Sequence, residues 1–252
     1  MSTLIIINGC TRGLGLAIVK CLVSKSDFSL LCLVRDNNHL SGLSSLKNDL
    51  LIFKCDYSIP EDALQFGEYL ETLLDGTFDK VYFINNISTL HPVGPIGNIN
   101  NEDIILSLNT NINSNLVILN NIISSAVKKK ILTFVLNISS SISINPLPGL
   151  SLYGIAKTYL DYVTKSLNLE NNKKNVQAST FYPGGIDTDM QATLVKSLRN
   201  RDDLKEYNYQ NLFTQKVSSS EKIAEVICNN FILNHNGWKN ATSNIYDYLK
   251  TT

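Results

Sequence analysis

The fold of this chain can be predicted from one stretch near its start, Leu4-Ile5-Ile6-Ile7-Asn8-Gly9-Cys10-Thr11-Arg12-Gly13-Leu14-Gly15. Its first four residues are uniformly apolar, which is typical of a buried strand, and residues 13–24 repeat apolar side chains with helical spacing. Between them, three glycines permit a tight turn and let backbone N–H groups approach a pyrophosphate at the N-terminus of the helix. A glycine-rich turn is weak evidence alone, but the strand before it and the helix after it are the context that such a site requires.

The same alternation of short apolar runs and helical periods continues to the end of the chain. Further strands are expected at 29–34, 50–54, 81–84, 131–138, 176–181 and 243–246, and further helices at 60–74, 103–127, 150–169 and 220–230. Buried strands separated by helices predict an α/β fold of the Rossmann type: a doubly wound, seven-stranded, mostly parallel sheet with helices on both faces. No composition break marks a second domain, so 1–252 is interpreted as one domain in which 189–212 forms an insertion of short helices, expected to act as a lid over a bound substrate.

Composition excludes several classes of function. The chain has 252 residues and equal numbers of basic and acidic residues, 22 each, which gives no electrostatic reason to expect nucleic acid or an anionic membrane as a partner. No stretch approaches the roughly 20 apolar residues of a membrane helix, and the N-terminus does not read as a signal peptide. The five cysteines and three histidines lack metal-site spacing. We therefore expect a cytoplasmic protein with reduced thiols and no metal.

The glycine spacing also resembles a known family. Gly-x-x-x-Gly-x-Gly is the motif of the short-chain dehydrogenase/reductase family, with Asn8 here in place of the usual Thr, and the resemblance spans essentially the whole chain. It implies a nicotinamide cofactor, whose pyrophosphate would be bound by Gly9, Cys10, Thr11, Arg12, Gly13, Leu14 and Gly15.

The end of the second strand indicates which nicotinamide cofactor is used. Enzymes that use NAD usually place an acidic residue there for the ribose 2′-hydroxyl, whereas this chain has Arg35, followed by Asp36. Arg12 supplies a second guanidinium, and two such groups can bind a 2′-phosphate. We therefore expect NADPH, although Arg35 could also be an ordinary solvated cation.

The resemblance implies further cofactor contacts. Asn85-Asn86-Ile87-Ser88 resembles the family's Asn-Asn-Ala-Gly, with bulkier residues in the last two places, and Pro183-Gly184-Gly185-Ile186-Asp187-Thr188 matches its Pro-Gly-x-x-x-Thr. On this basis the remaining cofactor contacts are expected at Asp56, Tyr57, Asn86, Tyr153, Lys157, Pro183, Gly184, Ile186, Asp187, Thr188, Asp189 and Met190, with Lys157 able to hold the ribose of the nicotinamide.

Tyr153 and Lys157 are the candidate catalytic pair. They lie four residues apart in an expected helix and therefore on one face of it. A phenol has an ordinary pKa near 10, which we expect a neighbouring ammonium and a cationic nicotinamide to lower. The resemblance adds Ser140, at the family's spacing from the tyrosine, as the group that binds the substrate oxygen, and Asn111 as the helix residue that holds a relay water.

Together these residues imply reduction of a carbonyl group, with Tyr153 as the proton donor. Within the family, Pro183–Gln191 and Asn244–Tyr248 look most like sepiapterin reductases and the related benzil reductases. Asn244 matches the position of the aspartate that anchors a pterin, so a pterin and a diketone both remain open as substrates. The expected substrate contacts are Ser140, Tyr153, Gly184 and Asn244.

Two other functions compete with this interpretation. The same fold could serve as a non-catalytic NADP-binding sensor, which intact Tyr153, Lys157 and Ser140 disfavour. The enzyme could also oxidise an alcohol with NAD, which Arg12 and Arg35 disfavour. By resemblance, helices 103–127 and 150–169 are expected to form the interface of a homodimer or homotetramer.

Overall fold

The structure, a computed structural model, describes residues 2–23, 25, 28–36, 50–76, 78–170, 175–214 and 216–249. Seven strands form the main sheet in the order β3-β2-β1-β4-β5-β6-β9, and neighbouring strands pair in parallel throughout. Their bounds are β1 (Thr3–Asn8), β2 (Ser29–Val34), β3 (Leu50–Lys54), β4 (Lys80–Asn85), β5 (Leu132–Ile138), β6 (Val176–Tyr182) and β9 (Thr242–Asn244). The strand order reverses between β1 and β4, which confirms the predicted doubly wound, seven-stranded sheet.

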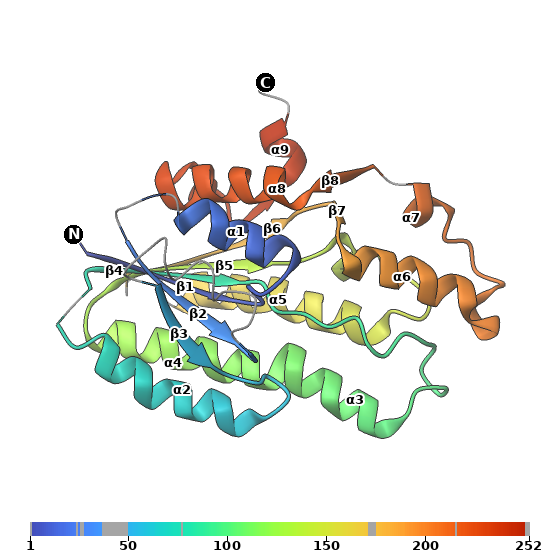
Figure 1. Cartoon of the computed structure of the whole chain (residues 1–252), viewed down its shortest axis with the longest axis horizontal. Helices are drawn as coiled ribbons and strands as arrows, with labels where there is room; N and C mark the ends of the chain where they lie inside the picture. Colours follow the sequence, from blue (N-terminus) through green and yellow to red (C-terminus); the bar gives the residue numbers. More distant parts are fainter. Residues whose placement is uncertain are drawn as a thin grey trace.

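Helices cover both faces of the sheet (Figure 1). On one face, α1 (Gly13–Val23) and α8 (Ser220–Ile227) share a hydrophobic cluster with alternate residues of the strands. On the other, α2 (Pro60–Leu73) and α4 (Ser114–Lys128) pack with the residues in between, and α5 (Ser151–Glu170) joins them. Apolar strands of this kind are buried on both faces, which explains why they read as continuous apolar runs rather than alternating ones.

The remaining elements lie beyond the carboxyl ends of the strands (Figure 1). They include α6 (Asp189–Asn200), α7 (Gln210–Thr214) and a small parallel pair, β7 (Gly185–Asp187) with β8 (Val217–Ser219). We call residues 189–214 the α6–α7 segment. Its apolar side chains pack with Leu90, Ile142 and Leu150 in a third cluster, separate from the two sheet-face clusters. The segment therefore has its own small core at the edge of the domain.

The prediction of one continuous helix over 103–127 was wrong in detail. The structure has α3 (Asn101–Leu108), a π-helical turn (Asn109–Asn113) and then α4. Asn100 begins α3, because its side chain accepts a hydrogen bond from the N–H of Glu102 at 2.9 Å. A π turn inserts one extra residue into the helical ladder, and hydrophobic periodicity alone does not reveal it.

Two boundaries near the C-terminus also differ. The helix expected at 220–230 ends as α-helix at Ile227 and continues as a π-helical segment, Cys228–Leu233. The strand expected at 243–246 ends at Asn244, and α9 (Ile245–Leu249) follows. The reason is a capping box: Asn244 Oδ1 accepts from the N–H of Tyr246 at 3.1 Å, and Asp247 Oδ2 accepts from the N–H of Asn244 at 2.8 Å.

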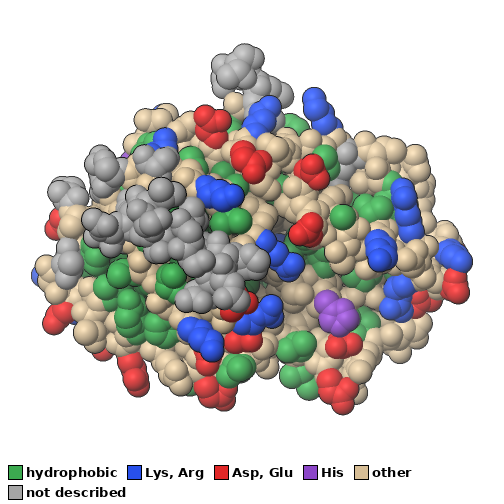
Figure 2. Space-filling model, in the orientation of Figure 1, with side chains coloured by type: hydrophobic (Ala, Val, Ile, Leu, Met, Phe, Trp, Pro, Cys, Tyr) green, Lys and Arg blue, Asp and Glu red, His purple; other side chains and the backbone are tan. Residues whose placement is uncertain are grey.

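The described residues include no helix with both the length and the apolar content needed to cross a membrane. On the face shown in Figure 2, acidic and basic side chains are interspersed, without a large area of either sign.

Candidate active site

A cavity of about 870 Å³ lies at the carboxyl edge of the sheet, where the strand order reverses. Most of the predicted site residues line it: Gly9, Cys10, Thr11, Arg12, Gly13, Leu14, Arg35, Asp36, Asp56, Tyr57, Asn86, Ser140, Tyr153, Lys157, Pro183, Gly184, Ile186, Thr188, Asp189 and Met190. Four predicted residues, Gly15, Asn111, Asp187 and Asn244, are not part of its wall.

The glycine turn forms one side of this cavity. Residues with a side chain could not adopt its backbone conformation at these glycine positions. Gly9 and Gly13 have φ values of +59° and +51°, in the left-handed region. A Cβ at Gly9 would lie 2.9 Å from the Cα of Ile87, and one at Gly15 would lie 2.0 Å from the carbonyl oxygen of Gly9. Gly15 therefore acts by packing the first turn of α1 against the loop, while the other two glycines shape the cavity wall itself.

A network of buried amides, which we call the amide network, ties the strand ends together. Asn8 Nδ2 donates to Asn85 Oδ1 at 2.9 Å, and Asn85 Nδ2 donates to Asn115 Oδ1 at 2.9 Å and to Asn137 Oδ1 at 2.8 Å. Asn137 then donates to the hydroxyl of Thr164 on α5 at 2.8 Å. No sequence motif marks this network, although an asparagine stands at or next to the end of three neighbouring strands.

Asn8 also bonds the loop that follows β4. Its Oδ1 accepts hydrogen bonds from the backbone N–H groups of Asn86 and Ile87 at 2.6 and 2.8 Å. Asn86 in turn donates from Nδ2 to the carbonyl oxygen of Gly9 at 2.9 Å. The departure from the family motif at residue 8 thus fixes the loop after β4 against the glycine turn.

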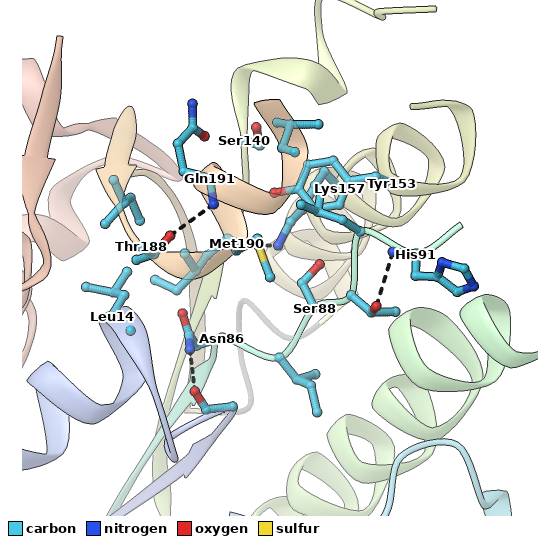
Figure 3. A pocket seen from close by; sticks show the side chains of 18 of the residues that line it. Leu14, Asn86, Ser88, His91, Ser140, Tyr153, Lys157, Thr188, Met190 and Gln191 are labelled. Atoms are coloured by element: carbon cyan, nitrogen blue, oxygen red, sulfur yellow. Dashed lines mark hydrogen bonds between the residues drawn. The ribbon is translucent and has the colours of Figure 1, made fainter. Parts of the chain in front are cut away.

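The geometry distinguishes Ser140 from its two serine neighbours. Ser139 is buried and its hydroxyl donates to the carbonyl oxygen of Lys157 at 3.3 Å, while Ser141 is exposed. Ser140 begins a short 3₁₀ turn and lines the cavity, and its hydroxyl acts to lower the pKa of the Tyr153 phenol. Ser140, Tyr153 and Lys157 lie together on one wall (Figure 3).

Burial shifts both members of the Tyr153–Lys157 pair toward their neutral forms. It raises the pKa of Tyr153 to about 12, against the opposing effect of the Ser140 hydrogen bond. It lowers the pKa of Lys157 to about 8, against the opposing effect of the Asp161 carboxylate. Burial thus acts against the lowering of the phenol pKa that is expected when a cationic nicotinamide lies beside the ammonium. A phenol with this pKa is protonated at neutral pH and can donate a proton.

Lys157 is held in place by the end of strand β5. Its ammonium donates to the carbonyl oxygen of Ile138 at 2.8 Å and lies 5.4 Å from the centre of the Tyr153 ring. Only 3% of Lys157 is exposed, so its remaining donors face the interior of the site rather than bulk water. The ammonium is thus oriented by backbone before any ligand enters.

The opposite end of the cavity carries the groups expected to bind an adenosine phosphate. Arg12 and Arg35 are both exposed and both belong to the cavity wall. Asp56 Oδ1 accepts from the N–H and the hydroxyl of Ser58 at 2.9 and 2.7 Å, and the Tyr57 hydroxyl accepts from Asn8 at 3.0 Å. Two guanidinium groups beside a glycine turn form a donor set that fits a dinucleotide with an extra phosphate.

Three predicted site residues, Asn111, Asp187 and Asn244, lie outside the cavity wall. Asn111 lies in the π turn, and its side chain bonds both backbone groups of Thr89, accepting from N–H at 2.8 Å and donating to the carbonyl oxygen at 3.0 Å. It therefore pins the loop after β4 instead of facing the cavity. The Asn244 side chain caps α9, so the expectation that it contacts substrate does not fit its position, and Asp187 lies in β7.

The substrate end of the cavity is largely uncharged. The α6–α7 segment and the facing loops contribute residues that no sequence motif marked: Leu90, His91, Leu106, Ile142, Asn145, Leu147, Leu194, Asn208, Tyr209, Asn211 and Leu212. His91 pairs with Asp103 at 3.2 Å. Within the described ranges, no three His, Cys, Asp or Glu side chains are grouped so that they could hold a metal ion.

Comparison with known proteins places this site in a family. The model of the family described as short chain dehydrogenase matches residues 3–199. The chain is 27% identical to a benzil reductase of Bacillus cereus over 194 residues, which covers 75% of the chain and 78% of the relative. It is also 27% identical to a benzil reductase of Saccharomyces cerevisiae, at 79% and 77% coverage, and 28% identical to an L-xylulose reductase of Caenorhabditis elegans, at 74% and 72% coverage.

Solved structures share the fold over nearly the whole chain. A 4-hydroxyisoleucine dehydrogenase complexed with NADH superposes with a TM-score of 0.77 at 20% identity, covering 96% of this chain and 95% of that one. A short-chain dehydrogenase from Sphingobium yanoikuyae in complex with NADPH gives 0.76 at 16% identity, covering 98% and 92%. The family match, the reductase relatives and the shared fold agree. The chain belongs to the short-chain dehydrogenase family and is an oxidoreductase.

Proposed function

We propose that this protein is a carbonyl reductase that uses NADPH to reduce an uncharged ketone or dicarbonyl. The observation that carries the proposal is the common wall formed by Ser140, Tyr153 and Lys157. This wall lies between a glycine turn suited to a pyrophosphate and a cavity end without fixed cationic side chains among the described residues.

Each residue of the site has a separate role in the proposed reaction. NADPH, when bound along the glycine turn, supplies the hydride. Ser140 and Tyr153 bind the carbonyl oxygen of the substrate, and Tyr153 donates a proton to that oxygen as negative charge develops there. The Lys157 ammonium stabilises the phenolate that remains, and its bond to Ile138 keeps it in position. The α6–α7 segment acts as a lid that keeps water from the reacting groups.

The preference for NADPH rests on Arg35 and Arg12. We expect Arg35→Asp to change the ratio of NADPH to NADH efficiency by about 10- to 100-fold in favour of NADH, because a charge-assisted contact is replaced by repulsion. Steady-state kinetics with both cofactors measures this ratio. Lys54→Asp is the matched control, since Lys54 is exposed at the end of the neighbouring strand and does not line the cavity. An unchanged ratio in the Arg35 variant would show that this residue does not touch the 2′-phosphate.

The substrate end favours a benzil-like diketone over a pterin. Leucines, Ile142 and Tyr209 supply apolar surface for aryl groups, and two of the relatives are benzil reductases. A pterin of the sepiapterin type has less support, because Asn244 lies outside the cavity wall and binds the start of α9.

A substrate panel tests the proposal. Purified protein is mixed with NADPH and benzil, isatin, sepiapterin or simple aldehydes, and NADPH absorbance is followed. We expect benzil and isatin to be reduced with higher kcat/KM than sepiapterin. Binding of NADPH without turnover of any carbonyl would instead support the alternative, a non-catalytic sensor on the same fold.

We also propose a homodimer built on the helices of one sheet face. Large apolar side chains are exposed on α3, α4 and α5, at Ile105, Leu116, Ile155, Tyr162 and Leu169. Burial of such a surface against a second copy would remove it from water. Light scattering after gel filtration measures the mass, and a monomer at micromolar concentration would contradict this part of the proposal.

A further inference from the structure

Ser88 occupies a position where the family pattern has a glycine, and the structure fixes its backbone from both sides. On one side, the N–H of Ile87 donates to Asn8 Oδ1 at 2.8 Å. On the other, both backbone groups of Thr89 are bonded by the Asn111 side chain. The direction of the Ser88 side chain is therefore set by two independent anchors, neither of which involves its own hydroxyl.

The Ser88 hydroxyl lacks a protein partner. Its Oγ is buried and has no hydrogen bond within the described part of the chain, although Ser88 belongs to the cavity wall. In Figure 3 this hydroxyl points into the cavity on the side of the Lys157 ammonium. A buried hydroxyl without a partner is unfavourable, which indicates that the partner arrives with a ligand.

We propose that Ser88 is a further cofactor-binding residue, whose hydroxyl bonds a hydroxyl of the ribose that the family resemblance assigns to Lys157, on the nicotinamide side of the cofactor. This inference rests on the proposed use of NADPH. Lys157 offers donors only, and one of them already bonds Ile138. A ribose hydroxyl can accept from the ammonium and still donate to Ser88 Oγ, so a diol satisfies both side chains where a carbonyl would not.

Access to this position involves Met190. Lys157 and the Ser88 Oγ are both closed off from bulk water, and the Met190 thioether lies beside the Lys157 ammonium in Figure 3. Met190 is at the start of α6 and packs partly buried against the third cluster. An unbranched thioether side chain changes rotamer readily, so it can give way when the cofactor enters.

The variant Ser88→Ala tests the proposal, with Ser114→Ala as its matched control. Ser114 has the same kind of buried, unpartnered hydroxyl, but it lies on α4 outside the cavity wall. Two ligands are titrated by fluorescence: NADPH, and adenosine 2′,5′-bisphosphate, which lacks the nicotinamide ribose. We expect Ser88→Ala to weaken NADPH binding about 3- to 10-fold, the size of one hydrogen bond, and to leave bisphosphate binding unchanged.

Each result separates this inference from the proposed function. Unchanged NADPH affinity in Ser88→Ala overturns the inference, and so does an equal loss for both ligands or an equal loss in Ser114→Ala. Wild-type protein that binds neither ligand overturns the proposed function, and the inference with it. Thermal unfolding gives a second readout, in which Ser88→Ala should show a smaller NADPH-induced rise of Tm than wild type and Ser114→Ala should not.

Discussion

The two walls of the cavity are built in different ways. The wall at the strand ends is held by backbone turns and by the amide network around Asn85, whose asparagines are buried. The wall formed by the α6–α7 segment is attached by a few side-chain contacts. Arg201 donates to the carbonyl oxygen of Val93 at 2.8 Å, and the Tyr209 hydroxyl donates to that of Pro148 at 3.0 Å.

This difference separates two tasks. The strand-end wall is fixed when the protein folds, because its polar groups are bonded to one another inside the core. Movement of the α6–α7 segment would disrupt only its own small hydrophobic cluster and a few hydrogen bonds to the facing loops. We therefore expect the first wall to determine chemistry and stability, and the second to determine which substrates enter and how tightly they bind.

The largest effect is expected from a change in the fixed wall that leaves its packing intact. Tyr153→Phe removes the proton donor and should lower kcat by roughly 10²- to 10⁴-fold while NADPH binding is retained. Single-turnover kinetics and cofactor titration measure the two quantities. Tyr162→Phe, on the exposed side of the same helix, is the control. Full activity in the Tyr153 variant would end the proposed mechanism.

Next in size is a change in stability. Asn85→Ala removes one acceptor of the Asn8 amide and the donor to the buried amide oxygens of Asn115 and Asn137, and should reduce the free energy of unfolding by about 2–4 kcal/mol. Denaturant titration measures this loss. Asn113→Ala removes an exposed amide bond to Asn109 and should change stability by less than about 0.5 kcal/mol. Equal losses in the two variants would mean that the network does not stabilise the strand ends.

A smaller effect, of a different kind, is expected in the α6–α7 wall. Arg201→Ala removes the bond to Val93 and should raise KM about 3- to 10-fold with little change in the free energy of unfolding. Arg199→Ala is the control, because Arg199 stacks on Phe213 within the same segment, 4.8 Å from the ring centre. If Arg201→Ala were as destabilising as Asn85→Ala, the two walls would not differ as described.

The smallest effect concerns pH. Burial lowers the pKa of Lys157 to about 8, while the negative charge of Asp161 acts to raise it. The Asp161 carboxylate also accepts a hydrogen bond from the Tyr182 hydroxyl at 2.6 Å. The reduction rate should fall as Lys157 loses its proton above that pH. In Asp161→Asn the supporting charge is gone, so the fall should move to lower pH. The profile of kcat against pH tests this, and a fall moved to higher pH would contradict the assigned role of Asp161.

The same contrast explains what could be predicted from sequence. The glycine turn, the positions of most strands and the Tyr153–Lys157 pair follow from local patterns, because each depends on backbone conformation, apolar runs or helical spacing within a few residues. The positions of Asn111 and Asn244 did not follow, since a π turn and a capping box decide where those side chains point. The segment 189–212 was expected to be a lid, but which of its side chains beyond Met190 reach the cavity could not be predicted, because tertiary packing alone brings them there.

The chemical make-up of the amide network has one more consequence. Its members are amides and hydroxyls, and even the phenol of Tyr57 that joins it has a pKa raised further by burial. None of these groups changes charge between about pH 5 and 9. The amide network therefore keeps the same charge over that range. A pH profile of activity would report on the titrating groups of the site, with no contribution from ionisation within the network.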